Sequence, residues 1–166
     1  MTELNIQRFN HLKIHTQYSI CEGAIKIEKL KDFCKENKIP CLGLSDTSNL
    51  CGALEFAENI SKVGTQPIIG TQIYFRFEDT TGLLPLIALN EKGYKRIIEL
   101  SSRSYLENDP LSDPHLDIKE LLSDTEGVSL LSGTIHGLFG KLFEKGRLEE
   151  IGKLYRGLSS NFHDRF

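Results

Sequence analysis

The chain has 166 residues, of which 39% are hydrophobic and 26% are charged, and its formal net charge is −3. This length suits one domain with a hydrophobic core, and the mildly acidic charge excludes a chain-wide basic surface of the kind that binds DNA tightly by itself. Residues 1–13 lack the apolar core of a signal peptide, and no apolar run reaches membrane-spanning length, so we expect a soluble, cytoplasmic protein with no membrane partner.

Strands and helices are expected to alternate along the first half of the chain. Short alternating or continuous apolar segments predict strands, and apolar residues that recur every three or four positions predict helices. The expected elements are a strand over residues 9–15, a helix over 24–37, a strand over 41–45, a helix over 49–63 and a strand over 67–77. The buried stripe of the second helix is expected to consist of Leu50, Leu54, Ala57 and Ile60.

The second half adds a hairpin, a long helix and shorter elements. A Thr-Thr-Gly turn at residues 80–82 predicts that residues 83–89 pair back on the preceding strand. There follow a helix over 91–106 with Tyr94, Ile97, Ile98 and Ser101 facing inward, a loop over 108–114, a helical turn over 118–122, a strand over 128–131 and helices over 137–145 and 148–160. This order predicts an α/β fold with a mostly parallel sheet.

Candidate metal ligands occur at the end of the first expected strand. His11 and His15 are four residues apart, so on a strand their side chains share one face. Lys13 lies between them on that face, and its cation would repel a metal ion. The four cysteines form no C-x-x-C pair, which disfavours a structural zinc site. Since a lone histidine at a strand end is most often a structural or surface residue, these residues alone leave the metal site open.

Polar residues also lie within or directly after the other expected strands, and the carboxyl ends of strands are where α/β folds place their sites. Gln72 lies in the middle of the strand expected over residues 67–77. Asp46 suits a metal ligand or a base, but its chemistry equally suits an N-cap of the next helix, which we favour from the residues alone. Gln72 and Thr134 are weak ligands for cations compared with a carboxylate. His136 lies close enough to Thr134 in sequence to face the same pocket, although an exposed loop histidine is the commoner case.

Longer blocks of the sequence carry a specific resemblance. Residues 9–30, 43–75, 86–106, 127–146 and 162–166, which begin FNHLKIH, GLSDTSN, LIALNEK, GVSLLSG and FHDRF, cover most of the chain. In order and spacing they resemble the polymerase-and-histidinol-phosphatase (PHP) domain at the N-terminus of bacterial DNA polymerase III alpha subunits. The resemblance implies a distorted, TIM-like β/α barrel. In members that keep a zinc or manganese cluster at the strand ends, it implies a metal-dependent phosphoesterase, including 3′–5′ exonucleases.

The chain departs from the ligand pattern of that family. Histidine, histidine, glutamate and cysteine of the family motifs are replaced, in that order, at Lys13, Thr47, Gln72 and Thr134. The residual ligands are His15 and Asp46, with His11 and His136 as further candidates. Each replacement removes a good ligand, so we expect low metal occupancy, no catalytic residue and no cofactor in this chain by itself.

The resemblance therefore implies a non-catalytic platform that docks a proofreading exonuclease subunit and the rest of the polymerase III holoenzyme. DNA-directed DNA polymerase activity (a nucleotidyltransferase reaction), its magnesium and contact with DNA are implied for the parent protein. Residues 1–166 are expected to form the N-terminal part of one PHP domain, an incomplete barrel without its C-terminal strands and without the polymerase domains. An unpaired strand edge in such a barrel favours self-association.

Two enzymatic alternatives remain open. The first is a metal-dependent phosphoesterase or 3′–5′ exonuclease that uses His15 and Asp46 with His11 or His136. A catalytic zinc needs three protein ligands and an open position, so this alternative requires His11, His15 and Asp46 to converge with Lys13 outside their pocket. The second is a stand-alone histidinol-phosphate or sugar-phosphate phosphatase, which is weaker because the second and third blocks resemble the polymerase branch of the family.

Overall fold

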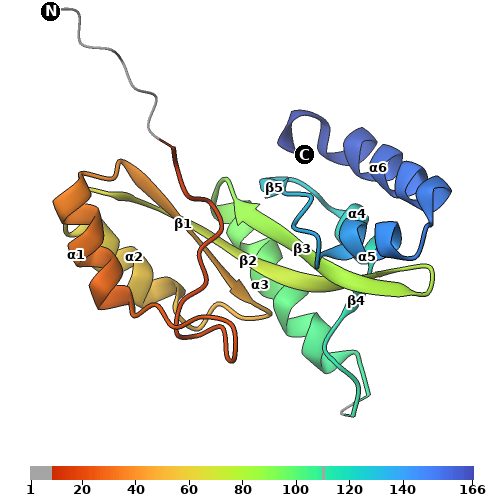
Figure 1. Ribbon diagram of the computed structural model, residues 1–166, viewed down its shortest axis with the longest axis horizontal. Coiled ribbons are helices and arrows are strands. Elements are labelled where there is room, and N and C mark those ends of the chain that lie inside the picture. Colours follow the sequence, from red (N-terminus) through yellow and green to blue (C-terminus); the bar gives the residue numbers. More distant parts are fainter. Residues whose placement is uncertain (1–8, 110) are drawn as a thin grey trace, which may run out of the picture.

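The computed structural model describes residues 9–109 and 111–166 of the chain (Figure 1). Its elements in chain order are α1 (Ile27–Asn37), β1 (Cys41–Thr47), α2 (Ala53–Ser61), β2 (Gln66–Phe77), β3 (Thr80–Ala88), α3 (Glu91–Leu106), β4 (Leu116–Asp117), α4 (Ile118–Ser123), β5 (Val128–Leu130), α5 (Leu138–Glu144), α6 (Leu148–Phe162) and the 3-10 helix η1 (His163–Arg165). Residues 1–8, which belong to the segment without a signal-peptide core, and Pro110 of the predicted loop lie outside the described residues.

One mixed sheet organises the fold, which confirms the α/β class. The strand order is β1-β2-β3-β5, and β4 pairs with β2. The pairings of β1 and β4 with β2 are parallel, whereas β3 is antiparallel to both β2 and β5. The hairpin turns at Glu78 and Asp79, not at the predicted residues 80–82, because Thr80 already pairs with Phe77. Glu78 has a φ of 53°, in the left-handed region that tight turns use.

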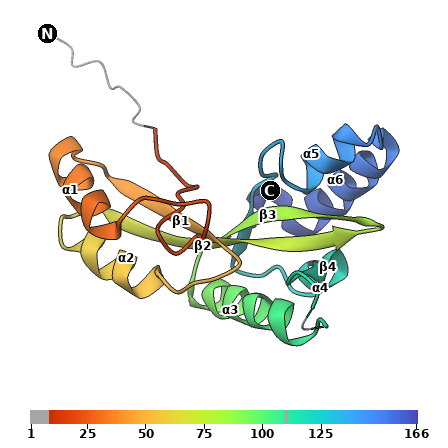
Figure 2. The same cartoon turned by 60° about the horizontal axis from the view of Figure 1, so that its bottom comes forward.

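Two hydrophobic clusters hold the sheet and helices together. The smaller packs α1 and α2 against β1, with Ile27, Leu44 and Phe56 fully or almost fully buried. The larger joins β2, β3 and β5 to α3 through α6, with Phe75 and Leu100 among its buried members. In Figure 2, α3 lies on one side of the β2–β3 ribbon and α5 and α6 lie on the other. The core therefore covers both faces of the central strands.

The predicted first strand over residues 9–15 is reduced to a single β-bridge between Ile14 and Leu44. The segment does run beside β1, since the Ile14 N–H donates to Gly43 O (3.1 Å) and the Gly43 N–H donates to His11 O (2.7 Å). A side chain at Gly43 would lie 2.6 Å from Leu12 Cα, so glycine is required for this close approach. The segment adds backbone pairing to the edge of β1 without forming a regular strand.

Helix α2 begins four residues later than predicted, and its buried stripe is shifted. The side chain of Asn49 accepts from the Cys51 N–H (3.0 Å), and this turn precedes the helix. Leu54, which was expected to be buried, is 73% exposed, and Phe56, which lies outside the predicted stripe, is fully buried. Ile60 is fully buried, as predicted. The predicted stripe counted residues 49–52 as helical, although they form the turn before α2.

Helix α3 has the predicted bounds, but its inward face is displaced by one position. Ile97 is buried, as predicted, but Leu100 is buried as well and Ile98 is 40% exposed. Arg96 is also buried, because its guanidinium donates to Asp124 O (3.2 Å) and Ser123 Oγ (3.0 Å). A polar residue thus belongs to the stripe, which apolar periodicity alone could not indicate. No helix of the described residues is both long and apolar enough to cross a membrane.

Candidate functional site

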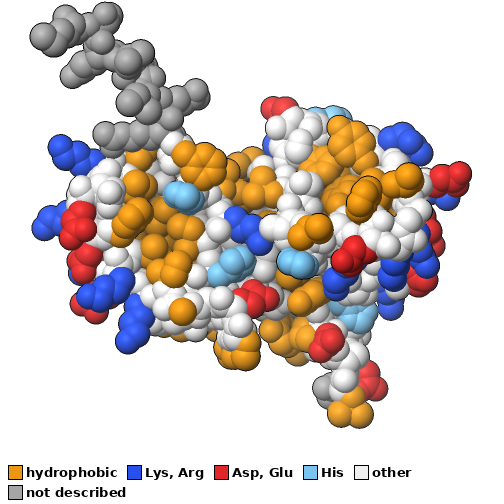
Figure 3. All heavy atoms as spheres, in the orientation of Figure 1, with side chains coloured by type: hydrophobic (Ala, Val, Ile, Leu, Met, Phe, Trp, Pro, Cys, Tyr) orange, Lys and Arg blue, Asp and Glu red, His pale blue; other side chains and the backbone are white. Residues whose placement is uncertain are grey.

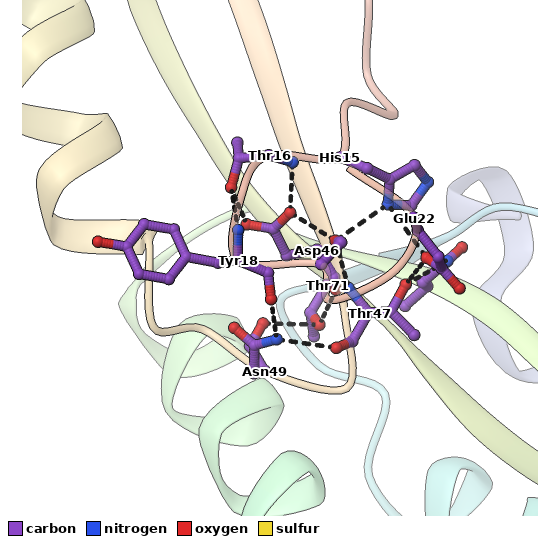
Figure 4. A network of polar contacts seen from close by, with 10 residues as sticks. His15, Thr16, Tyr18, Glu22, Asp46, Thr47, Asn49 and Thr71 are labelled. Atoms are coloured by element: carbon purple, nitrogen blue, oxygen red, sulfur yellow. Dashed lines mark hydrogen bonds and ion pairs between the residues drawn. The ribbon is translucent and has the colours of Figure 1, made fainter. Parts of the chain in front are cut away.

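Asp46 lies at the end of β1, where the loop before α1 folds over it (Figure 4). Its side chain is fully buried. Oδ1 accepts from the Thr16 N–H (2.6 Å) and the Ser19 hydroxyl (2.7 Å), and Oδ2 accepts from the Thr16 hydroxyl (2.7 Å). The favoured prediction that Asp46 caps the next helix is therefore wrong. The carboxylate instead holds the loop over residues 16–19 against the strand.

The loop after β1 is fixed from the other side by a second group of hydrogen bonds. Thr71 Oγ1 donates to Asp46 O (2.5 Å) and to Asn49 O (3.0 Å). The Asn49 amide donates to Tyr18 O (3.0 Å) and Thr47 O (2.9 Å), as Figure 4 shows. The two loops at this end of β1 are thus tied to each other and to β2, so the position of Asp46 is set by many contacts.

A third set of contacts centres on Glu22, a residue that sequence analysis did not single out. Its Oε2 accepts from the Thr47 hydroxyl, lies 3.5 Å from the Gln72 amide nitrogen and 4.0 Å from His15 Nδ1. Gln72 also donates to Thr47 Oγ1 (2.7 Å). Glycine at position 23 allows this fold, because a side chain there would lie 2.0 Å from Thr16 O. In the sequence, the only local sign of this tight loop is the glycine that follows Glu22.

His15, Glu22 and Gln72 border a small cleft of about 230 Å³. Five of the sequence candidates or their replaced positions line it, together with Glu22: Lys13, His15, Gln72, Thr134 and His136. Figure 3 shows basic, histidine and acidic side chains gathered at the centre of this face, between two hydrophobic areas. Most of the candidate residues therefore lie together at this cleft.

Three of the candidate or replaced positions do not line the cleft: Thr47, which hydrogen-bonds to Glu22, and the two candidate ligands His11 and Asp46. His11 is exposed and packs edge-on against Phe9, with ring centroids 4.8 Å apart, and it does not line the cleft. Its predicted alignment with His15 required a regular strand, which the segment does not form. Asp46 is buried behind the cleft and does not line it either. His11, His15 and Asp46 therefore do not share one open pocket, whereas Lys13 and His15 do.

Burial and neighbouring charges perturb the two basic groups of the cleft. Burial lowers the pKa of Lys13, and the nearby Glu22 carboxylate opposes this effect. Burial and then the Lys13 charge lower the pKa of His15, while Glu22 and Asp46 act in the opposite direction. A lowered pKa keeps the His15 imidazole neutral at pH 7. The cleft thus combines an ammonium, a neutral imidazole and a carboxylate.

The donor set does not fit a zinc or manganese cluster. Zinc sites in proteins use at least three protein ligands, and carboxylate ligands need a free lone pair directed at the metal. Both oxygens of Asp46 already accept hydrogen bonds from the chain, and the Lys13 ammonium shares the cleft with His15. Among residues 9–109 and 111–166, no group of three or more His, Cys, Asp or Glu side chains is arranged to hold a metal ion.

Comparison with known proteins places these observations in a family. The family model of the PHP domain matches residues 11–166. The DNA polymerase III subunit alpha of Caulobacter vibrioides is 35% identical over 175 aligned residues, which cover 100% of this chain and 15% of that protein. The same subunit of Rickettsia felis is 37% identical, over 95% of this chain and 13% of its own length. The chain therefore spans 15% or less of the length of these relatives.

A solved structure gives a partial likeness. An amidohydrolase from Chromobacterium violaceum aligns with 58% of this chain and 33% of its own, at 15% sequence identity and a TM-score of 0.48. The family assignment rests on the sequence match, which extends from the segment beside β1 to the last residue of the chain. On that match, the chain belongs to the PHP domain family.

Proposed function

We propose that this chain is the N-terminal PHP portion of a DNA polymerase III alpha subunit and that it serves as a non-catalytic platform. The names of its relatives and their alignment with 95–100% of this chain support the proposal. In this proposal the polymerase activity, the contact with DNA and the cytoplasmic location are properties of the whole subunit. The contribution of the PHP portion is a stable surface for other subunits, including a proofreading exonuclease.

One observation carries the non-catalytic part of the proposal. The cleft that would hold the metal ions contains the Lys13 ammonium beside His15, and the remaining acidic candidate, Asp46, is committed to the loop through both oxygens. A metal-bound hydroxide needs a cation held by several ligands with an open position. Two of the family positions, Thr47 and Gln72, instead hydrogen-bond to each other.

An exonuclease assay tests this absence of catalysis. The 166-residue chain would be incubated with a labelled DNA strand in the presence of zinc or manganese, and strand shortening would be followed by gel electrophoresis. We expect no turnover above that of a His15→Ala variant, because His15 is the histidine left in the cleft at a family ligand position. Metal-dependent turnover that the His15→Ala variant loses would contradict the proposal.

The docking role has a separate test. The chain and the proofreading exonuclease subunit encoded in the same genome would be mixed and passed over a size-exclusion column. Co-elution at a stoichiometric ratio is the expected result, since the proposed role requires a direct contact. Independent elution at micromolar concentrations of both proteins would remove the docking part of the proposal and leave the non-catalytic part unaffected.

A phosphoesterase remains the second candidate, and one observation favours it. Glu22, which the sequence analysis missed, lies in the cleft with His15 and His136. These three side chains include the ligand types of a catalytic zinc site. Against this candidate, Glu22 already accepts hydrogen bonds from Thr47 and Gln72. The assay above distinguishes the two candidates.

A further inference from the structure

One exposed stripe of helix α6 carries large apolar side chains. Leu148 is 64% exposed and Tyr155 is 56% exposed. Together with Gly152 and Ser159 they follow one another at intervals of four, three and four residues, which is the spacing of the contact seam in a coiled coil. The stripe that α6 buries in its own protein is a different one and consists of Leu154, Leu158 and Phe162. The helix therefore has a second stripe with coiled-coil spacing that its own fold does not cover.

The exposed stripe continues into an aromatic group at the end of the chain. The rings of Tyr155 and Phe166 have centroids 5.7 Å apart, and Phe166 stacks on Phe139 of α5 at 6.1 Å. In Figure 3 a hydrophobic area lies on the side of the molecule where Figure 1 places α5 and α6. Exposed aromatic side chains that adjoin one another are typical of protein–protein contact surfaces. The face of α6 thus has the composition of an interface.

Two opposite charges flank this stripe on one side. Glu149 directly follows Leu148, and Arg156 directly follows Tyr155, so the two charged residues hold the same position beside the seam, one heptad apart. Both are exposed, and within the part of the chain that the structure describes neither side chain has a hydrogen-bond or ion-pair partner. In an antiparallel pair of α6 helices, Glu149 of each copy would lie beside Arg156 of the other. The charge pattern is therefore complementary to itself.

The sizes of the side chains are self-complementary in the same arrangement. In an antiparallel seam, Gly152 of one copy faces Tyr155 of the other, and Leu148 faces Ser159. Each layer then combines a large residue with a small one, which lets the two helices interdigitate. The nearest atoms to a Cβ placed at Gly152 belong to the Arg156 guanidinium (3.3 Å to Nη1), the flexible end of a surface side chain. The space above Gly152 can thus receive the ring of a partner's tyrosine.

We propose that two copies of this chain associate through α6, with the two helices antiparallel across a two-fold axis. The same surface of each copy forms the contact, as in other isologous dimers. Tyr155 of each copy packs on the partner's Gly152, and two ion pairs between Glu149 and Arg156 fix the antiparallel orientation. The seam spans only about three helical turns, which is small for a specific interface, so we expect a weak dimer with a dissociation constant of roughly 10–100 µM.

This surface is separate from the strand edge that an incomplete barrel would expose. The edge of β5 is covered in part by η1, since the Arg165 guanidinium donates to Val128 O (2.8 Å) and the Ser129 hydroxyl donates to Arg165 O (2.8 Å). A charged side chain on an edge carbonyl opposes pairing with another strand. The inference also uses no residue of the polar cleft, so it stands or falls independently of the proposed function.

Sedimentation velocity of the 166-residue chain, from micromolar concentrations to about 0.5 mM, tests the dimer by an exchange of charges. The wild type should change from monomer to dimer over this range. Glu149→Arg and Arg156→Glu each replace two attractive pairs by two repulsive ones, so each variant alone should dimerise roughly tenfold more weakly or worse. An equimolar mixture of the two variants should dimerise like the wild type, because every arginine of the first then faces a glutamate of the second.

Matched controls come from α1, which lies at the opposite end of the molecule from α6 (Figure 1). Glu28 and Lys35 are exposed and also seven residues apart on one helix, so Glu28→Arg and Lys35→Glu repeat the same charge changes away from the proposed surface. Both should dimerise like the wild type. Tyr155→Ala should weaken the dimer roughly tenfold or more, because it removes the aromatic anchor. Circular dichroism verifies that each variant is folded.

Three results would overturn the inference. The first is a wild-type chain that stays monomeric at the highest concentration, which would leave the exposed stripe to a partner other than a second copy. The second is a dimer that Glu149→Arg and Arg156→Glu form as tightly as the wild type, since another surface would then hold it together. The third is a mixture of these two variants that dimerises no better than either alone.

Discussion

Replacing Asp46 by alanine should strongly destabilise the protein even in the absence of metal. The carboxylate is fully buried and accepts three hydrogen bonds, from the Thr16 N–H, the Thr16 hydroxyl and the Ser19 hydroxyl. Leaving a buried donor unsatisfied costs about 1–3 kcal/mol, and losses within one network do not add fully. We therefore expect Asp46→Ala to lower the free energy of unfolding by about 3–5 kcal/mol.

Urea denaturation in EDTA, followed by circular dichroism and linear extrapolation, measures this difference. Asp46→Asn should cost less, about 1–3 kcal/mol, because its carbonyl oxygen can still accept from the Thr16 N–H. Asp32→Ala, at an exposed position of α1, is the control and should stay within about 0.5 kcal/mol of the wild type. An Asp46→Ala protein as stable as the wild type would refute the reasoning, since a carboxylate that only awaits a metal ion contributes no stability to the metal-free protein.

Three further predictions concern the cleft, a surface ion pair and the core. Lys13→Met should raise the pKa of His15, because the Lys13 charge lowers it. An NMR titration of the imidazole measures this pKa, and an unchanged value would contradict the prediction. Arg147 lowers the pKa of Asp79 from 3.8 to about 2, so the pair stabilises the protein above pH 4 and this contribution disappears as the pH falls to 2. Urea midpoints over this range should fall less steeply in Arg147→Met, and equal slopes would exclude the pair. Leu100→Ala should cost about 2–5 kcal/mol in urea denaturation, because Leu100 is fully buried in the larger cluster; a loss under 1 kcal/mol would contradict its place there.

The fold could be predicted where local sequence signals decide the structure. Helix α3 has its predicted bounds because Asn90 caps it, accepting from the Gly93 N–H (3.0 Å), and a long amphipathic pattern follows. The predicted bounds were wrong where a turn interrupts the apolar pattern, as at Asn49 before α2 and at Glu78 in the hairpin. The prediction of a first strand was wrong because the conformation of that segment depends on the close approach of Leu12 to Gly43, which is distant in the sequence.

The candidate site could be predicted in part. The end of β1 lies beside the middle of β2, where Thr47 pairs with Gln72, and the segment that pairs with β1 at Ile14 carries Lys13 and His15, so these three side chains border the same cleft. The role of Asp46 could not be predicted, because a buried carboxylate after a strand suits a ligand, a cap or an anchor equally well. Glu22 was missed since its partners are 25 and 50 residues away in the sequence. Such contacts depend on how the loop folds back, and no periodicity signals them.

The central claim is that this PHP domain holds no metal cluster, and elemental analysis of the purified protein tests it most directly. The 166-residue chain would be dialysed against zinc and then manganese, freed of loosely bound ions, and analysed beside a His15→Ala variant. The account predicts less than one tightly bound ion per chain and no difference between the two proteins. Two or more ions per chain in the wild type, lost in His15→Ala, would contradict it and would make the phosphoesterase the leading function.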